Sequence, residues 1–246
     1  MKNSSPRFAR FLLAGALICS LAPAQADLFS VSPDKERKLG QEAAAEIEKS
    51  PAIVSGPVED WVQRVGAKLV AVSNPEFQYS FHVIDSPEIN AFCLPGGHVY
   101  VYTGLRKIVR TDDELAAVLA HEITHAENHH YAKQSKKSNT RGSILTIGSI
   151  LLGLPGIGQA AVGILDASMS AKYSRSNEYE ADSVGLARMQ RAGFKGEAMV
   201  TVLDRLANED SLQSVDRWMS DHPEGKKRVL AIKRLLGQPV PVSTNP

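Results

Sequence analysis

The residues of this chain best suited to chemistry are His121 and His125, which flank Glu122 in the sequence HEITH. Residues four apart lie one turn apart on a helix, so both imidazoles project from one face and can bind a single metal ion. Neutral imidazole nitrogens suit zinc. Glu122 would lie beside that metal, where a carboxylate can take a proton from water and pass it to a leaving amine. This spacing predicts metal-assisted hydrolysis.

The sequence around this motif favours a helix. Thr111 and Glu114 stand in capping-box positions ahead of the apolar run LAAVLA. The alternative is a surface helix that carries the motif by coincidence. However, a capped amphipathic helix that follows a short sheet is the setting in which the motif binds metal.

A third ligand can come from the same helix or from a later one. The pattern HExxHxxGxxH requires glycine at 128 and histidine at 131, but the chain has Asn128 and Tyr131. His130 falls one position short of the end of that pattern, and His129 falls two positions short. We interpret them as helix-end residues, because histidine is favoured in the last turn of a helix.

A carboxylate from a later helix completes the site in the second way. Glu178 and Asp182 in NEYEAD lie one turn apart and face the same direction. Glu178 is the predicted metal ligand, and Asp182 is predicted to accept a hydrogen bond from a ligand histidine. Glu180 would point elsewhere, and we interpret it as a solvated acid.

Helices and strands that must position these residues follow from periodicity. Apolar and polar residues alternate in the manner of strands at 79–86 and 98–104, and 89–94 is a short β-like run between them. Pro95-Gly96-Gly97 is interpreted as a tight turn between the last two of these strands. Helices, a small sheet and further helices predict an α+β fold. Helices are expected at 32–50, 58–73, 111–130, 174–193, 195–208 and 223–236, and strands at 79–86, 89–94 and 98–104.

The first 26 residues read as a signal peptide, with a basic start, an apolar run and Ala24-Gln25-Ala26 before the cut. A retained membrane anchor is the alternative. A single domain is expected at 27–236 and a disordered tail at 237–246. Without its leader the chain has 28 − 3 = 25 basic and 27 acidic groups, so we expect no nucleic-acid partner. Cys93 would then be the only cysteine, and we interpret it as a buried small apolar residue.

The apolar segment 143–165 has two interpretations. It is either a helical lid packed over the metal cleft or a hairpin that contacts a membrane. The basic sequence KQSKKSNTR before it suits an anionic lipid surface as well as a solvated loop. Glycines and Pro155 disfavour a straight membrane span, and we favour the lid.

At these residues the chain resembles the gluzincin metallopeptidases, the group of HtpX, the CAAX prenyl proteases and periplasmic outer-membrane quality-control proteases. The resemblance extends over nearly the whole chain after residue 26. It is closest to the soluble periplasmic members, although the tetratricopeptide-type tail of some relatives is missing. The segments that carry it are ERKLGQEAAAEIE, INAFCLPGGHVYVYTGL, DELAAVLAHEITHAENHH, YSRSNEYEADSVGL and Asp221-His222-Pro223.

The resemblance implies a zincin-type fold, mostly helical, with a small mixed sheet whose edge strand lies above the HExxH helix. It implies one Zn²⁺ on His121, His125 and Glu178, with Glu122 as general base. His222 would stabilise the oxyanion, ligate zinc in a resting state, or serve only as a structural cap.

The same resemblance places Asn90 and Ala91 on the edge strand, where an extended peptide can add as a further strand. The alternative for Asn90 is a plain turn residue. We therefore expect a zinc-dependent endopeptidase of the periplasm, peripheral to the outer membrane, that hydrolyses misfolded or unfolded proteins. Its partners would be extended polypeptides and the outer-membrane assembly machinery or the membrane surface. The alternative is a chaperone or assembly factor that grips such chains with little or no proteolysis.

Overall fold

A computed structural model describes residues 32–73, 76–137, 173–208, 222–223 and 225–240. The predicted signal peptide, the apolar segment 143–165 and the last residues of the predicted tail lie outside these ranges. Within the described residues, no helix is both long enough and apolar enough to cross a membrane.

Six helices lie where periodicity predicts them, with ends that shift by a few residues, but the helix at His130–Lys137 and the 3₁₀ helix at Thr103–Lys107 were not expected from the sequence. Side chains cap several of them: the Thr111 hydroxyl accepts from the Glu114 amide at 3.2 Å, and the Ser174 hydroxyl accepts from the Asn177 amide at 3.3 Å. The Glu114 carboxylate accepts from the Arg110 amide at 2.7 Å, so the capping box reaches one residue further back than expected. The helices are α1 (Pro33–Ile47), α2 (Pro57–Ala71), α3 (Asp112–Glu127), α4 (His130–Lys137), α7 (Arg175–Arg191), α8 (Glu197–Asn208) and α10 (Gly225–Leu235), with a 3₁₀ helix at Thr103–Lys107.

The strands form one mixed sheet in the order β1-β2-β4-β3. They are β1 (Ile53–Val54), β2 (Ser80–Ile84), β3 (Ala91–Leu94) and β4 (His98–Tyr102). Strands β2 and β4 are parallel, whereas β1 and β3 pair antiparallel with their neighbours. Of these strands, only the two-residue β1 was not expected from the sequence. Strand β3 is an edge strand, and it packs against α3, as the resemblance implies.

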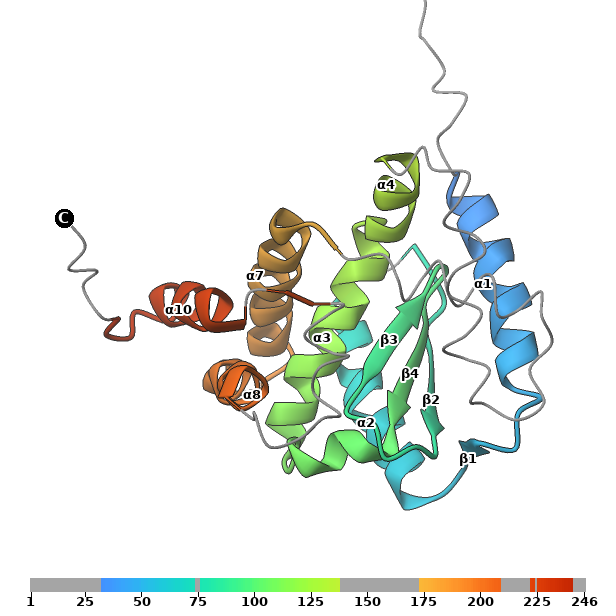
Figure 1. Cartoon of the computed structure of the whole chain (residues 1–246), viewed down its shortest axis with the longest axis horizontal. Coiled ribbons are helices and arrows are strands. Elements are labelled where there is room, and N and C mark those ends of the chain that lie inside the picture. The colour runs from blue at the N-terminus through green and yellow to red at the C-terminus, as the bar shows by residue number, and fades with distance from the viewer. Residues whose placement is uncertain (1–31, 74–75, 138–172, 209–221, 224, 241–246) are drawn as a thin grey trace, which may run out of the picture.

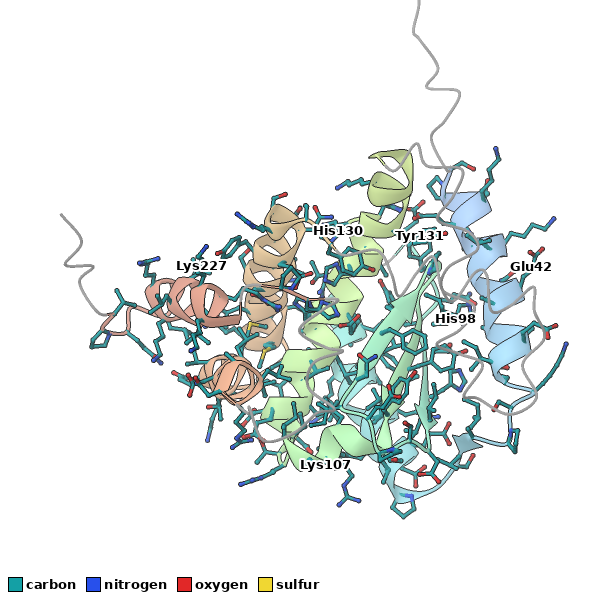
Figure 2. The ribbon with its side chains drawn as sticks, in the orientation of Figure 1. Glu42, His98, Lys107, His130, Tyr131 and Lys227 are labelled. Carbon is teal, nitrogen blue, oxygen red and sulfur yellow. The ribbon has the colours of Figure 1, made fainter. Side chains whose placement is uncertain are left out.

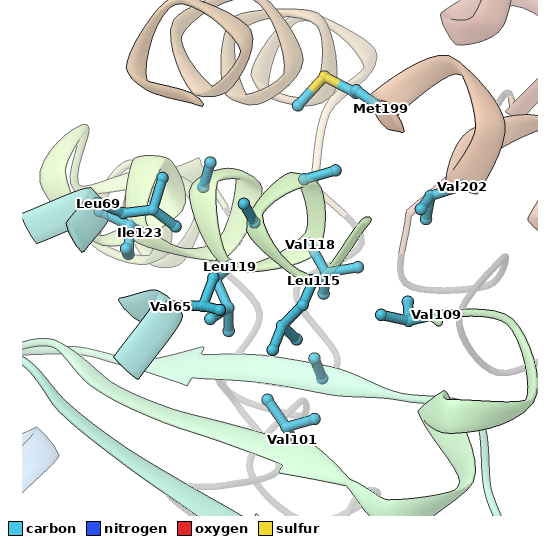
Figure 3. Close-up of a cluster of buried hydrophobic side chains, with 14 of the residues drawn as sticks. Val65, Leu69, Val101, Val109, Leu115, Val118, Leu119, Ile123, Met199 and Val202 are labelled. Carbon is cyan, nitrogen blue, oxygen red and sulfur yellow. The ribbon is translucent and has the colours of Figure 1, made fainter. Parts of the chain in front are cut away.

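Helix α3 is the centre of the molecule (Figure 1), between the sheet on one side and α7, α8 and α10 on the other. Its apolar residues pack against Val101 of the sheet and against Val65 and Leu69 of α2 (Figure 3). Met199 and Val202 of α8 close the other side of this core. Helix α1 covers the opposite face of the sheet with a second, smaller core. The fold is therefore the mostly helical α+β arrangement that the sequence predicts, with the HExxH helix held on both sides.

Candidate metal centre

The HExxH residues lie in the second half of α3, on a part of the helix that is closed from solvent. His121, Glu122 and His125 are each 1–3% exposed. The Nε2 atoms of the two histidines are 2.9 Å apart, so one turn of helix brings both to a single point, as predicted.

Helix α7 brings the predicted carboxylate to that point. Gly185 allows a close approach, because a Cβ there would lie 3.2 Å from the Ala120 carbonyl of α3. As a result, one oxygen of Glu178 lies 3.5 Å from His121 Nε2 and the other lies 3.4 Å from His125 Nε2. The two sequence segments, 53 positions apart, meet at one place in the fold.

His222, from the segment before α10, is the fourth residue at this centre. Its Nδ1 lies 3.2 Å from His121 Nε2 and 3.2 Å from a Glu178 oxygen, and its Nε2 lies 3.7 Å from Glu122 Oε1. It is 3% exposed. This position favours a role beside the metal over a structural cap.

The donor set fits a divalent cation such as zinc. One ligand atom from each of His121, His125, Glu178 and His222 lies within 4.8 Å of the other three. Tetrahedral zinc with bonds of about 2.0–2.1 Å would separate its ligand atoms by about 3.3 Å, close to the 2.9–3.5 Å found here. His121 Nδ1 lies 2.9 Å from the Asp182 carboxylate, so that nitrogen carries the proton and Nε2 presents a lone pair.

The electrostatics of His125 and Glu178 agree with this donor set, whereas His222 favours its protonated form while no metal is bound. Burial, reinforced by neighbouring His121, holds the pKa of His125 well below its usual value, so its imidazole is neutral and able to ligate. Burial alone would raise the pKa of Glu178, but His222 and Arg228 hold it well below the usual range. Burial alone would lower the pKa of His222, but the Glu178 carboxylate raises it.

Glu122 lies beside the donor atoms, as the sequence predicts for a base. Burial raises its pKa, and His222 and His121 oppose the shift. Its Oε1 is buried and has no hydrogen-bond partner within the described part of the chain. A carboxylate oxygen left open next to a metal position is suited to bind water.

Sequence reasoning missed Arg228. This residue of α10 is 1% exposed and donates to both oxygens of Asp182 at 2.7 Å. It also lies 2.7 Å from a Glu178 oxygen and 3.4 Å from the His222 carbonyl. Burial alone would raise the pKa of Asp182, but Arg228 lowers it to about 2. The only sequence signal was an arginine in phase with the apolar positions Val229 and Ile232 of its helix.

The interpretation of His130 as a helix-end residue was incomplete. Its Nδ1 lies 2.8 Å from His125 Nδ1, and its Nε2 lies 3.2 Å from Glu180. Glu180 is exposed as predicted, but it is not only solvated, because it also accepts from Asn128 at 2.8 Å. Tyr173 stacks on the His125 ring with centroids 3.8 Å apart. His129 instead contacts Glu36 of α1, away from the donor atoms.

Of the two residues that the resemblance placed on the edge strand, Ala91 is the first residue of β3, whereas Asn90 lies directly before the strand. Asn90 is 1% exposed, accepts from the Ala91 amide through its side chain, and leaves its Nδ2 without a partner in the described structure. The Asn90 carbonyl bonds the Tyr102 amide of β4, so the alternation of an antiparallel pair turns the backbone of Ala91 and Cys93 outward. Within the described residues, no strand pairs with that outer side.

Cys93 is the buried small residue that the sequence predicts. It is 7% exposed, its side chain packs in the core shared with α3, and burial raises the pKa of its thiol well above the usual value.

Comparison with known proteins agrees with this geometry. Residues 57–236 match the family model of Peptidase family M48. The chain belongs to this family. Its HExxH helix, the Glu178 helix and His222 all lie within the matched residues.

Two kinds of relative cover most of the chain. It is 34% identical over 212 residues to the mitochondrial metalloendopeptidase OMA1 of Schizosaccharomyces pombe, covering 84% of this chain and 62% of that protein. It is 29% identical over 255 aligned positions to the beta-barrel assembly-enhancing protease of Escherichia coli, covering 94% of this chain and 52% of that protein. The chain therefore spans about half to three fifths of the length of these relatives.

Proposed function

We propose that this protein is a zinc-dependent endopeptidase that uses His121, His125 and Glu178 to hold the metal and Glu122 as general base. The observation that supports this most directly is the convergence of three ligand atoms beside the open Oε1 of Glu122. Bound zinc would supply a Lewis acid that activates water and polarises the scissile carbonyl. Two imidazoles and a carboxylate are the donor set of known catalytic zinc sites.

The protein groups around the metal divide the remaining work. Glu122 Oε1 would accept a proton from the attacking water and deliver it to the leaving amine. Asp182 holds His121 in the tautomer that presents Nε2, and Arg228 holds Asp182. The outward carbonyl of Ala91 and the outward backbone of Cys93 would bond an extended peptide as an added strand, with Asn90 Nδ2 as a further donor. Recognition through backbone bonds suits substrates with little sequence in common.

His222 is proposed to hold the resting state. Its Nδ1 lies with the ligand atoms of His121, His125 and Glu178, where it would be the fourth ligand of a bound zinc ion. Catalytic zinc sites leave this fourth coordination position to water or substrate. Departure of His222 would free that position and leave its imidazole near Glu122, where it could stabilise the developing oxyanion. The segment 143–165 keeps its two alternatives, a lid over the cleft or a membrane-contacting hairpin.

We propose the periplasm as the location and misfolded or unfolded envelope proteins as the substrates. The leader-like features of residues 1–26 support export. The name of the Escherichia coli relative connects it to β-barrel assembly, which supports a partner at the outer membrane. The second candidate, a chaperone with little or no proteolysis, is favoured by one observation, the fourth position filled by His222.

Casein hydrolysis by the purified protein tests this function. Glu122→Gln should lower the rate by about 10²–10⁴-fold, because it removes the base and keeps the shape. Glu42→Gln, an isosteric change on the exposed side of α1, is the control and should leave the rate unchanged. A chelator should abolish cleavage, and added zinc should restore it. Equal cleavage by Glu122→Gln would reject the enzymatic proposal. Suppression of casein aggregation without cleavage by the wild type would favour the chaperone.

A further inference from the structure

The two ligand histidines are supported on their far sides by different groups. His121 Nδ1 faces the buried carboxylate of Asp182, which is a common arrangement for a metal-binding histidine. His125 Nδ1 faces another imidazole, His130, at 2.8 Å. His130 is fully buried, and its other nitrogen lies 3.2 Å from Glu180, whose side chain is 46% exposed. A chain of side chains therefore runs from His125 to the protein surface.

The backbone is built to bring His130 to this place. His129 has a φ of 50°, in the left-handed region that few residues other than glycine adopt. This conformation ends α3 and starts α4, and it turns His130 back towards the helix that it follows. Figure 2 shows His130 at the junction of α3 and α4, close to α7. The His129 side chain contacts Glu36 of α1, which helps to hold the turn.

The hydrogen bonds that link His125, His130 and Glu180 allow only one assignment of donors and acceptors. A carboxylate accepts, so Glu180 requires the proton on His130 Nε2. A neutral His130 then has a bare Nδ1, which accepts from the Nδ1–H of His125. The proton of His125 therefore sits on Nδ1, and its Nε2 presents a lone pair to the other donor atoms. In the opposite direction His125 would carry its proton on Nε2, where it would block the metal.

We propose that His130 and Glu180 act as positioning residues for the metal, by fixing His125 in the tautomer and orientation that ligate. This inference rests on the proposed function only in that His125 binds zinc. Partners of this kind change metal affinity by about 10–100-fold in other metal sites. Removal of the His130 acceptor should therefore weaken zinc binding by about that factor.

Zinc affinity of the full chain, measured by competition with a chromophoric chelator, tests the proposal independently of proteolysis. His130→Ala should weaken binding by about 10–100-fold. His130→Asn places an amide oxygen near the position of Nδ1 and keeps the acceptor, so it should restore most of the affinity. His130→Gln places its amide near the position of Nε2 and should not. A purely structural role predicts no difference between the Asn and Gln variants.

Variants at Glu180, the exposed end of this hydrogen-bonded series, complete the test. Glu180→Ala should weaken zinc binding several-fold, because His130 then has no carboxylate to fix its proton. Asn128→Ala removes the other hydrogen bond of Glu180 and leaves His130 untouched, so it is the matched control and should bind zinc like the wild type. Cobalt-substituted protein offers a second readout, since a displaced His125 should alter the visible absorption of the metal.

Three results would overturn the proposal that the His130–Glu180 pair (the relay) positions His125. The first is equal zinc affinity of His130→Ala and the wild type. The others are an equal loss of zinc affinity in His130→Asn and His130→Gln, or in Glu180→Ala and Asn128→Ala. None of these results depends on whether peptides are cleaved. If Glu122→Gln cleaves casein as fast as the wild type while the zinc affinities follow the relay, the proposed function fails and the relay stands.

Discussion

Replacement of Arg228 by methionine is the sharpest test of how the centre is held together. The guanidinium makes three contacts of 2.7 Å, two with Asp182 and one with Glu178. Asp182 and Glu178 are 1–2% exposed, so water does not reach them when the arginine is removed. Methionine keeps most of the volume and removes the charge. The metal-free protein is used, because a bound dication would itself compensate the two carboxylates.

The expected loss in the free energy of unfolding follows from the fact that an unpaired buried carboxylate is more stable in its neutral form than in its charged form. It takes up a proton. At pH 7, protonation of a group with an ordinary pKa of about 4 costs about 4 kcal/mol. This figure agrees with the roughly 3–5 kcal/mol expected when one partner of a buried ion pair is removed. Uptake of one proton by either carboxylate offsets the single positive charge that is lost, so we expect a loss of about 4 kcal/mol rather than twice that amount.

The pH dependence has a definite sign. In the wild type the pKa of Asp182 is lowered to about 2 and that of Glu178 lies well below its usual value. Their stabilisation is therefore fully present above about pH 4 and is lost only as the pH falls towards their folded pKa values. In Arg228→Met the folded state holds an extra proton that the unfolded state has released above about pH 4. Stability of the variant relative to wild type should fall by about 1.4 kcal/mol for each unit of rising pH.

Urea unfolding in the presence of chelator, at pH 5 and pH 7, measures both quantities. The difference between variant and wild type should grow by about 3 kcal/mol between these values. Arg188→Met is the control, because Arg188 is equally buried but bonds two hydroxyls, a carbonyl and the partly exposed Glu127. Its effect should vary by less than about 1 kcal/mol over the same range. A loss below about 1 kcal/mol in Arg228→Met, or a loss independent of pH, would refute the reasoning.

Two further predictions concern the edge strand and the resting state. Gly40 of α1 lies against the turn between β3 and β4, and a Cβ there would lie 1.5 Å from the Pro95 carbonyl. Gly40→Ala should lower the free energy of unfolding by about 2–3 kcal/mol, because the added methyl group overlaps this carbonyl. In an unhindered helix the same change raises the free energy of unfolding by about 1 kcal/mol. Thermal unfolding of the variant shows which of the two changes occurs. His222→Ala should raise the rate of casein cleavage and of autocleavage if His222 holds the resting state. Unchanged rates would remove that hypothesis, and a rate lowered by about 10²-fold would assign His222 to the oxyanion instead.

Local patterns were sufficient to predict most elements of the fold. The apolar periodicity of α2 and α3, the alternation of β2 and β4, and the Pro95-Gly96-Gly97 turn depend on residues within a few positions of one another. The same holds for the HExxH half of the site, because one helical turn fixes the spacing of His121 and His125. Strand β1 was missed because two residues are too few to show a period.

Partners from distant elements could not be predicted in the same way. Arg228 and Asp182 are 46 positions apart, and an arginine on an amphipathic helix usually lies at its solvated edge. His130 stands next to His129 in the sequence, yet one contacts the metal centre and the other contacts α1. The left-handed backbone at His129 makes that difference, and no spacing rule contains it.

The sequence by itself determined which groups can do chemistry here: two imidazoles, a ligand carboxylate and a base, with their order along the chain. These properties depend on side-chain type and on one helical repeat. The tertiary structure alone decided which nitrogen of each histidine is turned towards the other donor atoms, because that choice depends on the hydrogen-bond partner at the opposite nitrogen. Those partners come from α4 and α7, and only the packing of these helices against α3 brings them there.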